Sequence, residues 1–350
     1  MNTVFVGTRT TRERNARGEG IGVYDFDPAT ARLALRQLIG GLVNPSYLAL
    51  NRAGDRLFTV HGDGDAVSVL RPDASGVWGL MQTLPCDLRN PVHLALDPSE
   101  RALVVSSHLT GELVVLPVAD DGALSAPVQR IALPGEPGPH RKEQPFSKPH
   151  FNPFDRSGRF VLVPDKGLDR LFSFYFDSRS RLLDERQSLK TRENAGPRNL
   201  AFHPAQPWAY VVNELDSTVT AYRFDATSGA LDAFQTVPSL PDDFTGDSRA
   251  AGVAVHPGGR WLYASNRGHD SIALFAIDAA RGRLAFVEAV PAQGRTPRFF
   301  TPTPDGRFLL VLNEDSDSIV GFAVDSSTGR LTPTGDATPC GSPVCLVVAP

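Results

Sequence analysis

Short apolar runs separated by polar turns rich in Gly and Pro recur from one end of the chain to the other. The clearest example is 196–214, GPRNLAFHPAQPWAYVVNE, in which two apolar runs flank a His-Pro turn. The same design returns at 296–314 and, less closely, at 250–267. Apolar runs of about 4–8 residues between such turns are typical of β-strands, and repetition of one design is typical of repeat architectures. The pattern therefore predicts an all-β chain built from one repeated unit.

Each unit opens on a strand led by a proline or its equivalent, which we call the leading strand. After it come a turn, a second strand, a polar turn, a third strand that ends near Phe-x-Asp, and an outer Gly-x-Leu segment. Leading strands are predicted at 45–50, 91–96, 149–151, 197–202, 250–255, 297–302 and 343–348. Four strands in a unit of roughly 45–50 residues indicate a propeller blade. The sequence thus predicts a seven-bladed β-propeller with four-stranded blades, forming a single domain over residues 1–350.

The two ends of the chain carry complementary pieces of one blade. Residues 3–7 (TVFVG) match a second strand, whereas residues 344–348 (VCLVV) match a leading strand. Pairing of the N- and C-terminal strands would build the first blade from both termini and close the ring. Closure would remove the free sheet edge that a linear array of repeats has to protect.

Composition and charge indicate which partners and which cellular compartment to expect. The 350-residue chain has a formal net charge of −4 and no Lys/Arg-rich segment, so we expect no nucleic-acid partner. No apolar run is long enough to span a bilayer, and the opening MNTVFVGTRT lacks the features of a secretion signal. We therefore expect no membrane partner and a cytoplasmic monomer. Reduced thiols are expected at the three cysteines, Cys86, Cys340 and Cys345.

Aligning the units by their turns defines two rings of equivalent positions. The first ring follows the leading proline and consists of Ser46, Val92, His150, Arg198, Ala251, Arg298 and Val344. The second ring follows the second strand and consists of Gly62, His108, Lys166, Glu214, Arg267 and Glu314. In a propeller the leading strand lines the central channel, and the second strand is its antiparallel neighbour. Both rings are therefore expected to converge on one mouth of the channel.

Charge concentrates on one side of this mouth. The later blades fill their positions with charged or basic residues, whereas the first two blades carry mostly small or apolar groups. The residues concerned are His150, Arg198, Glu214, Arg267, Arg298 and Glu314. In a structural interpretation, Arg198 and Glu214 form a satisfied ion pair and His150 is an ordinary buried histidine. In a functional interpretation, a candidate base, a carboxylate and several guanidinium groups converge for chemistry.

The segment before His150 departs from the repeat. Residues 134–148, PGEPGPHRKEQPFSK, make a longer connection than the other units have, and they include His140, Arg141 and Lys142. By position we expect a loop over the same mouth. Such a loop is either a solvated surface segment or a source of substrate contacts, for which Arg141 is the candidate.

With these residues the chain resembles the lactonase family of seven-bladed propellers, which includes bacterial 6-phosphogluconolactonases and fungal carboxy-cis,cis-muconate cyclases. The resemblance covers essentially the whole chain. Its most specific motifs are GPRNLAFHP at 196–204, VNE at 212–214 and SNRGHD at 265–270. One departure is SKPH at 147–150, where the family often has His-Pro-His. The resemblance implies a catalytic set made of His150, Arg198, Glu214 and Arg267.

A lactone that carries phosphate or carboxylate groups suits this mouth, because guanidinium is a planar donor for oxyanions. Hydrolysis needs a base for water, a group that stabilises the tetrahedral oxyanion and an acid for the leaving alkoxide. Glu214 or His150 is the candidate base, and Arg198 and Arg267 are candidates for holding the oxyanion or the anionic arm. Further substrate contacts are expected from Arg298, Glu314, Arg141 and His108.

Three functions remain open at this point. Hydrolysis of an anionic sugar lactone, as in the 6-phosphogluconolactonases, is the leading hypothesis. The alternatives are a cyclase, in which a carboxylate adds to a double bond and an acid such as His150 delivers a proton, and a non-catalytic propeller that binds an anionic ligand or a protein. We expect no cofactor, and no metal either, because a calcium site needs several clustered Asp, Asn or Glu oxygens and this mouth is rich in Arg.

Overall fold

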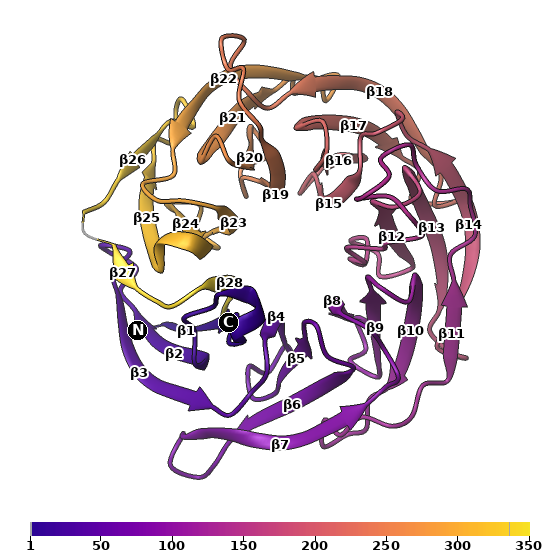
Figure 1. Ribbon diagram of the computed structural model, residues 1–350, viewed down its shortest axis with the longest axis vertical. Helices are drawn as coiled ribbons and strands as arrows, with labels where there is room; N and C mark the ends of the chain where they lie inside the picture. The colour runs from indigo at the N-terminus through magenta and orange to yellow at the C-terminus, as the bar shows by residue number, and fades with distance from the viewer. Residues whose placement is uncertain (1, 336) are drawn as a thin grey trace.

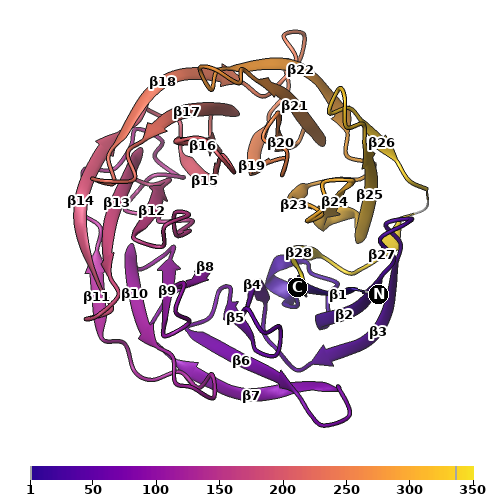
Figure 2. The same ribbon diagram turned by 180° about the vertical axis from the view of Figure 1, so that it is seen from behind.

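Seven antiparallel sheets stand around a common axis in the computed structural model, which describes residues 2–335 and 337–350 (Figure 1). Each sheet is one blade, and its strands follow one another from the axis to the rim, as the view from behind also shows (Figure 2). The only helices in the described part of the chain are two 3-10 turns, η1 (Arg12–Arg14) and η2 (Glu314–Ser316). The predicted all-β, seven-bladed propeller is confirmed.

The strands fall into four concentric sets. The innermost are β4 (Pro45–Leu50), β8 (Pro91–Leu96), β15 (Pro197–Phe202), β19 (Arg249–Val255), β23 (Pro297–Pro302) and β28 (Pro343–Val348). The second set is β1 (Asn2–Thr8), β5 (Leu57–His61), β9 (Ala102–Ser107), β12 (Phe160–Asp165), β16 (Trp208–Asn213), β20 (Trp261–Arg267) and β24 (Phe308–Asn313). The third set is β2 (Gly20–Phe26), β6 (Ala66–Pro72), β10 (Glu112–Pro117), β13 (Arg170–Asp177), β17 (Thr218–Phe224), β21 (Ser271–Ile277) and β25 (Ser318–Val324). The outermost are β3 (Leu33–Gly40), β7 (Trp78–Pro85), β11 (Gln129–Ala132), β14 (Leu182–Lys190), β18 (Leu231–Pro238), β22 (Leu284–Pro291), β26 (Leu331–Pro333) and β27 (Thr338–Pro339).

The two termini share one blade, in the order β28-β1-β2-β3. Strand β28 pairs with β1 in an antiparallel register that sets Val4 opposite Val348 and Val6 opposite Leu346. The ends of the chain lie side by side in Figures 1 and 2. The predicted closure of the ring is therefore confirmed.

One blade differs from the prediction, because residues 149–151 do not form a regular strand. This blade has only β12, β13 and β14 as strands, and the segment before them contributes isolated bridges at Pro149 and Phe154. Pro149 and Pro153 have no N–H to donate to a ladder. The side chain of Asn152 bonds instead to the preceding blade, donating from Nδ2 to the Val104 carbonyl at 2.9 Å. His150 therefore lies on an irregular segment held by two blades.

Apolar side chains between neighbouring blades form the core. The described residues make seven buried clusters, and each combines two adjacent blades. Between the blades of β4 and β8, for example, Phe58 and Val69 pack with Leu103 and Val114. Burying one such side chain contributes roughly 1.5–3 kcal/mol. Packing between sheet faces thus holds the blades in a ring and fixes the positions at its centre.

The predicted Gly-x-Leu segments are contacts between blades. Gly282 has a φ of +71°, and a Cβ there would lie 2.4 Å from the indole of Trp208 in the preceding blade. The Tyr210 hydroxyl donates to the Gly282 carbonyl at 3.0 Å. Gly329 meets Trp261 in the same way. Glycine is needed at this position because both the backbone conformation and the close indole exclude a side chain.

Candidate active site

Apart from His150, the first-ring positions lie at β-bulges. In β15 the register with β16 shifts between Pro197 and Asn199, so Arg198 has no partner in the ladder. The same shift leaves Ser46 in β4 and Arg298 in β23 without a partner on the neighbouring strand. A bulge re-aims the extra side chain, and six of the seven predicted positions line one pocket at the mouth. They are Ser46, Val92, His150, Arg198, Arg298 and Val344.

The second ring is defined by a repeated backbone bond. In the blades that have a leading proline, the N–H of the residue after the second strand donates to the carbonyl of the residue before that proline, as Glu214 does to Gly196 at 2.8 Å. Arg9 makes the same bond to Ser342 at 3.0 Å. Arg9 is therefore the seventh member of this ring. It was not among the predicted residues, because its blade is split between the two ends of the chain. The expectation that the first blades carry mostly small or apolar groups at the mouth is wrong for Arg9.

Glu214 lies at the centre of a cluster of cations. Its Oε2 is 3.0 Å from Arg198 Nε, and its Oε1 is 3.1 Å from Lys166 Nζ and 3.4 Å from Arg267 Nη2. The side chains of Glu214, Arg198 and Lys166 are each less than a tenth exposed. Arg198 Nη1 also donates to the Ala251 carbonyl at 2.5 Å. One carboxylate thus fixes three cationic side chains from three different blades.

The loop at 134–148 reaches this cluster through Glu143. Glu143 Oε2 is 3.1 Å from Lys166 Nζ, and its Oε1 is 3.1 Å from Arg249 Nη1. Gln144 secures the loop by donating to the Lys166 carbonyl at 2.9 Å. Arg141, the candidate from the sequence, is exposed, and its role stays a prediction. Lys166 was recognised as a member of the second ring but was given no role, and Glu143 was not among the candidates because its loop has no counterpart in the other blades.

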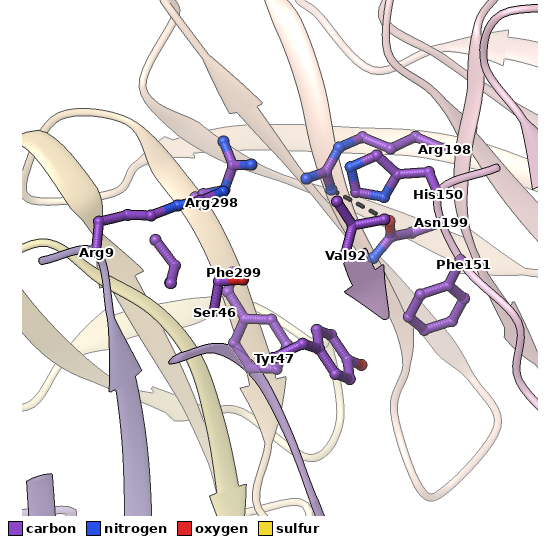
Figure 3. Close-up of a pocket in the computed structure, with 11 residues that line it drawn as sticks. Arg9, Ser46, Tyr47, Val92, His150, Phe151, Arg198, Asn199, Arg298 and Phe299 are labelled. Carbon is purple, nitrogen blue, oxygen red and sulfur yellow. Dashed lines mark hydrogen bonds between the residues drawn. The ribbon is translucent and has the colours of Figure 1, made fainter. Parts of the chain in front are cut away.

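His150 lies beside Arg198 at the edge of the pocket (Figure 3). Its ring is edge-on to that of His108, with centroids 5.4 Å apart. Within the described residues, the buried Nδ1 atoms of His150 and His108 have no hydrogen-bond partner. Burial and then the charge of Arg198 hold the pKa of His150 well below its usual value. Burial and the nearby Lys166 lower the pKa of His108 to about 3. Both imidazoles are therefore uncharged at neutral pH.

The charge state of Glu214 follows from its neighbours. Burial alone would raise the pKa of this carboxyl, but Lys166, Arg267 and Arg198 outweigh burial and hold the pKa well below its usual value. Both of its oxygens are also engaged by these cations, whereas the Nδ1 atom of His150 has no hydrogen-bond partner among the described residues. Of the two candidate bases, the geometry therefore favours His150, and Glu214 fixes the cations around it.

The remaining predicted contacts lie on the opposite side of the mouth. Arg298 Nη1 is 3.5 Å from Glu314 Oε2, and both side chains are partly exposed. Below them, an aromatic floor is formed by Tyr47, Phe151 and Phe299. The ring centroid of Tyr47 lies 6.1 Å from that of Phe151 and 6.3 Å from that of Phe299. Figure 3 shows these rings beneath the polar groups. The pocket thus has an apolar base, and polar groups face each other above it.

Residues 2–335 and 337–350 contain neither a candidate metal centre nor a membrane-spanning helix. No group of three or more His, Cys, Asp or Glu side chains in them could hold a metal ion. No helix among them is both long and apolar enough to cross a membrane. The charged groups at the mouth are mostly cationic, which suits an anionic ligand.

The fold and the cationic mouth define the class as a seven-bladed propeller with a site for an anionic ligand, and comparison with known proteins supplies the family. The model of the family described as "Lactonase, 7-bladed beta-propeller" matches residues 3–348, so the chain belongs to this family. The predicted family is confirmed.

Individual relatives cover most of the chain. It is 34% identical over 302 residues to a protein of Bacillus subtilis named 6-phosphogluconolactonase, covering 85% of this chain and 83% of the relative. Among solved structures, one described as the periplasmic gluconolactonase PpgL of Pseudomonas aeruginosa superposes with a TM-score of 0.90 at 29% identity, covering 100% of this chain and 99% of that one. A Lactobacillus plantarum protein superposes with a TM-score of 0.91 at 26% identity, covering 99% of each chain.

Proposed function

We propose that this protein is a lactone hydrolase that opens an anionic sugar lactone at the mouth of the propeller. The observation that carries the proposal is the pairing of an uncharged, unpartnered His150 with Arg198, which Glu214 holds in place. An uncharged imidazole accepts a proton, and a fixed guanidinium stabilises a developing oxyanion. These are two of the groups that ester hydrolysis requires.

In the proposed reaction His150 acts first as a base and then as an acid. His150 removes a proton from a water molecule as that water attacks the lactone carbonyl. Arg198 stabilises the negative charge that develops on the carbonyl oxygen. The tetrahedral intermediate then collapses, the ring C–O bond breaks, and the imidazolium of His150 returns its proton to the leaving alkoxide. Glu214 stays ionised throughout and holds Arg198, Arg267 and Lys166 in position.

The leading substrate is 6-phosphogluconolactone, on the strength of the names of the relatives. Several guanidinium groups around one pocket fit a substrate that carries a phosphate or carboxylate. We further propose that the protein acts as a cytoplasmic monomer, although one structural relative is described as periplasmic.

Hydrolysis accounts for the site better than either alternative. A cyclase needs a proton donor at the double bond, and an imidazole whose pKa lies well below its usual value is seldom protonated at neutral pH. A non-catalytic scaffold is disfavoured because relatives that cover most of this chain are named as lactonases.

A panel of lactones tests the proposal. Purified protein is assayed with 6-phosphoglucono-δ-lactone, glucono-δ-lactone and a muconolactone, with spontaneous opening as the blank. We expect enzymatic opening of the phosphorylated sugar lactone. We expect His150→Gln to lower kcat by about 10²–10⁴-fold, because the variant lacks the proposed base. His203→Gln is the matched control, since His203 lies in the turn between β15 and β16, at the other end of these strands from Arg198 and Glu214, and bonds to the Gly259 carbonyl at 2.9 Å. No opening of any lactone above the blank would contradict hydrolysis.

A further inference from the structure

Arg9 is a buried cation that its surroundings do not satisfy. Its side chain is 5% exposed, and in the described part of the chain its Nε and Nη1 have no hydrogen-bond partner. Figure 3 shows Arg9 and Arg298 entering the pocket from the side opposite His150 and Arg198. Buried polar groups are almost always hydrogen-bonded in folded proteins, so an exception of this kind points to a missing partner.

The nearest carboxylate is already engaged. Asp63 accepts from Arg14 Nε at 2.7 Å and bonds to Arg14 Nη2 through its other oxygen. Arg9 Nη1 lies 3.6 Å from Asp63, beyond hydrogen-bond distance. Burial and then the charge of Arg298 lower the pKa of Arg9 to about 10, so the guanidinium stays charged at neutral pH.

A glycine makes room for this guanidinium. Gly62 holds the second-ring position in the next blade, where other blades have side chains such as His108 or Glu214. A Cβ on Gly62 would lie 2.3 Å from Arg9 Nη1 and 2.7 Å from Ser46 Oγ. The Ser46 hydroxyl is also buried without a partner among the residues described. Arg9 and Ser46 thus direct several free donors to one place.

We propose that Arg9, Ser46 and Arg298 form a subsite for the phosphate group of the substrate, across the pocket from the reacting end at His150 and Arg198. This inference rests on the proposed function. A phosphate brings up to two negative charges and three acceptor oxygens, which match two guanidinium groups and a hydroxyl. Arg298 is available because its only carboxylate contact among the described residues is Glu314 at 3.5 Å. The uncharged hydroxymethyl group of an unphosphorylated lactone offers no such match.

The preference between two lactones that differ only in the phosphate tests the subsite. The measured quantity is kcat/KM for 6-phosphoglucono-δ-lactone divided by kcat/KM for glucono-δ-lactone. We expect Arg9→Met to lower this ratio by about 10–100-fold, the usual size of a hydrogen bond to a charged group, with the loss mainly in KM. Arg12→Met removes the same charge from an exposed position on η1 and leaves the ratio unchanged. An equal loss on both lactones in Arg9→Met would overturn the subsite.

Gly62→Ala displaces Arg9 without deleting it. The atoms nearest to the added methyl are the ends of the Arg9 and Ser46 side chains, so we expect the variant to fold and the same ratio to fall. A retained ratio in both Arg9→Met and Gly62→Ala excludes the subsite.

Inorganic phosphate tests binding without any chemistry. We expect phosphate to raise the Tm of the wild type by preferential binding to the folded state, and to raise it much less in Arg9→Met and Gly62→Ala. Equal rises in all three proteins would overturn the subsite. If the wild type gains stability from phosphate and the variants do not, yet no lactone is opened, the subsite stands and the proposed reaction fails.

Discussion

Arg198 and Glu214 form a buried ion pair at the mouth of the propeller, with Nε and Oε2 3.0 Å apart and both side chains less than a tenth exposed. Arg198 lies on a bulge of the innermost strand and Glu214 directly follows its antiparallel neighbour. Lys166 and Arg267 contact the same carboxylate, so the single negative charge of Glu214 faces three positive charges. Removing one member of such a buried group leaves the others uncompensated.

The first prediction concerns this carboxylate. Glu214→Gln keeps the volume but leaves three cations without their shared partner, so we expect the free energy of unfolding to fall by about 3 kcal/mol. We also expect kcat to fall, since Arg198 loses its anchor. Urea denaturation and steady-state kinetics on the same preparation measure both effects.

Glu314→Gln is the matched control for this change. Glu314 occupies the equivalent position two blades on, but its only ion pair within residues 2–335 and 337–350 is with Arg298 at 3.5 Å, and its side chain is 17% exposed. We expect its loss to cost less than about 1 kcal/mol. Similar losses in the two variants would contradict the central role of Glu214.

The second prediction concerns the pH dependence of the reaction. Because burial and Arg198 hold the pKa of His150 well below its usual value, the base remains deprotonated throughout the neutral range. We expect kcat/KM, after subtraction of spontaneous opening, to stay flat from about pH 6 to 8, a range that includes the ordinary histidine pKa. A limb with an apparent pKa near that ordinary value would argue for a different base.

Much of the architecture could be predicted from the sequence because each blade repeats the same local rules. The leading proline, the apolar alternation and the turns place the first ring correctly even though no single position is informative alone. Six of its seven positions line the pocket. What failed was the strand at 149–151, where two prolines and the buried Asn152 override the repeat.

The missed site residues share a different cause. Arg9 belongs to a ring position, but its blade is divided between the chain ends, so aligning units from proline to proline leaves it out. Glu143 lies in a loop with no counterpart in other blades, and only the folded loop brings it within 3.1 Å of Lys166. Side-chain partners of this kind depend on long-range packing, which spacing along the chain does not encode.

The third prediction is a loss of stability in mild acid. Burial lowers the pKa of His93 and of His108 to about 3, so below the unfolded value near 6.5 the unfolded chain binds protons that the folded protein does not. Unfolding free energy then falls with pH, by about 2 kcal/mol for each such histidine at pH 5. Asp165, whose pKa burial raises to about 6, opposes this by about 1 kcal/mol. Glu214 adds its own loss only at lower pH, because its depressed pKa keeps its contribution intact above about pH 4.5.

The variant His108→Gln measures how much of this loss of stability comes from His108 alone. We expect the variant to lose about 2 kcal/mol less than the wild type between pH 7 and pH 5, measured by urea denaturation at each pH. Equal losses would mean that His108 is not buried in its uncharged form.

The fourth prediction concerns ring closure. Strand β28 places Leu346 opposite Val6 and buries it to 2% exposure, so the terminal strand supplies both a ladder and part of a core cluster. Leu346→Ala should lower the free energy of unfolding by about 2–5 kcal/mol. Deletion of residues 341–350 should abolish cooperative unfolding, because it removes the innermost strand and exposes a free edge on β1. Leu182→Ala, at a position 38% exposed on β14, is the matched control and should cost about 0.5 kcal/mol or less. Thermal unfolding followed by circular dichroism compares the three proteins with the wild type, and a deletion variant that melts like the wild type would show that the ring does not depend on its terminal strand.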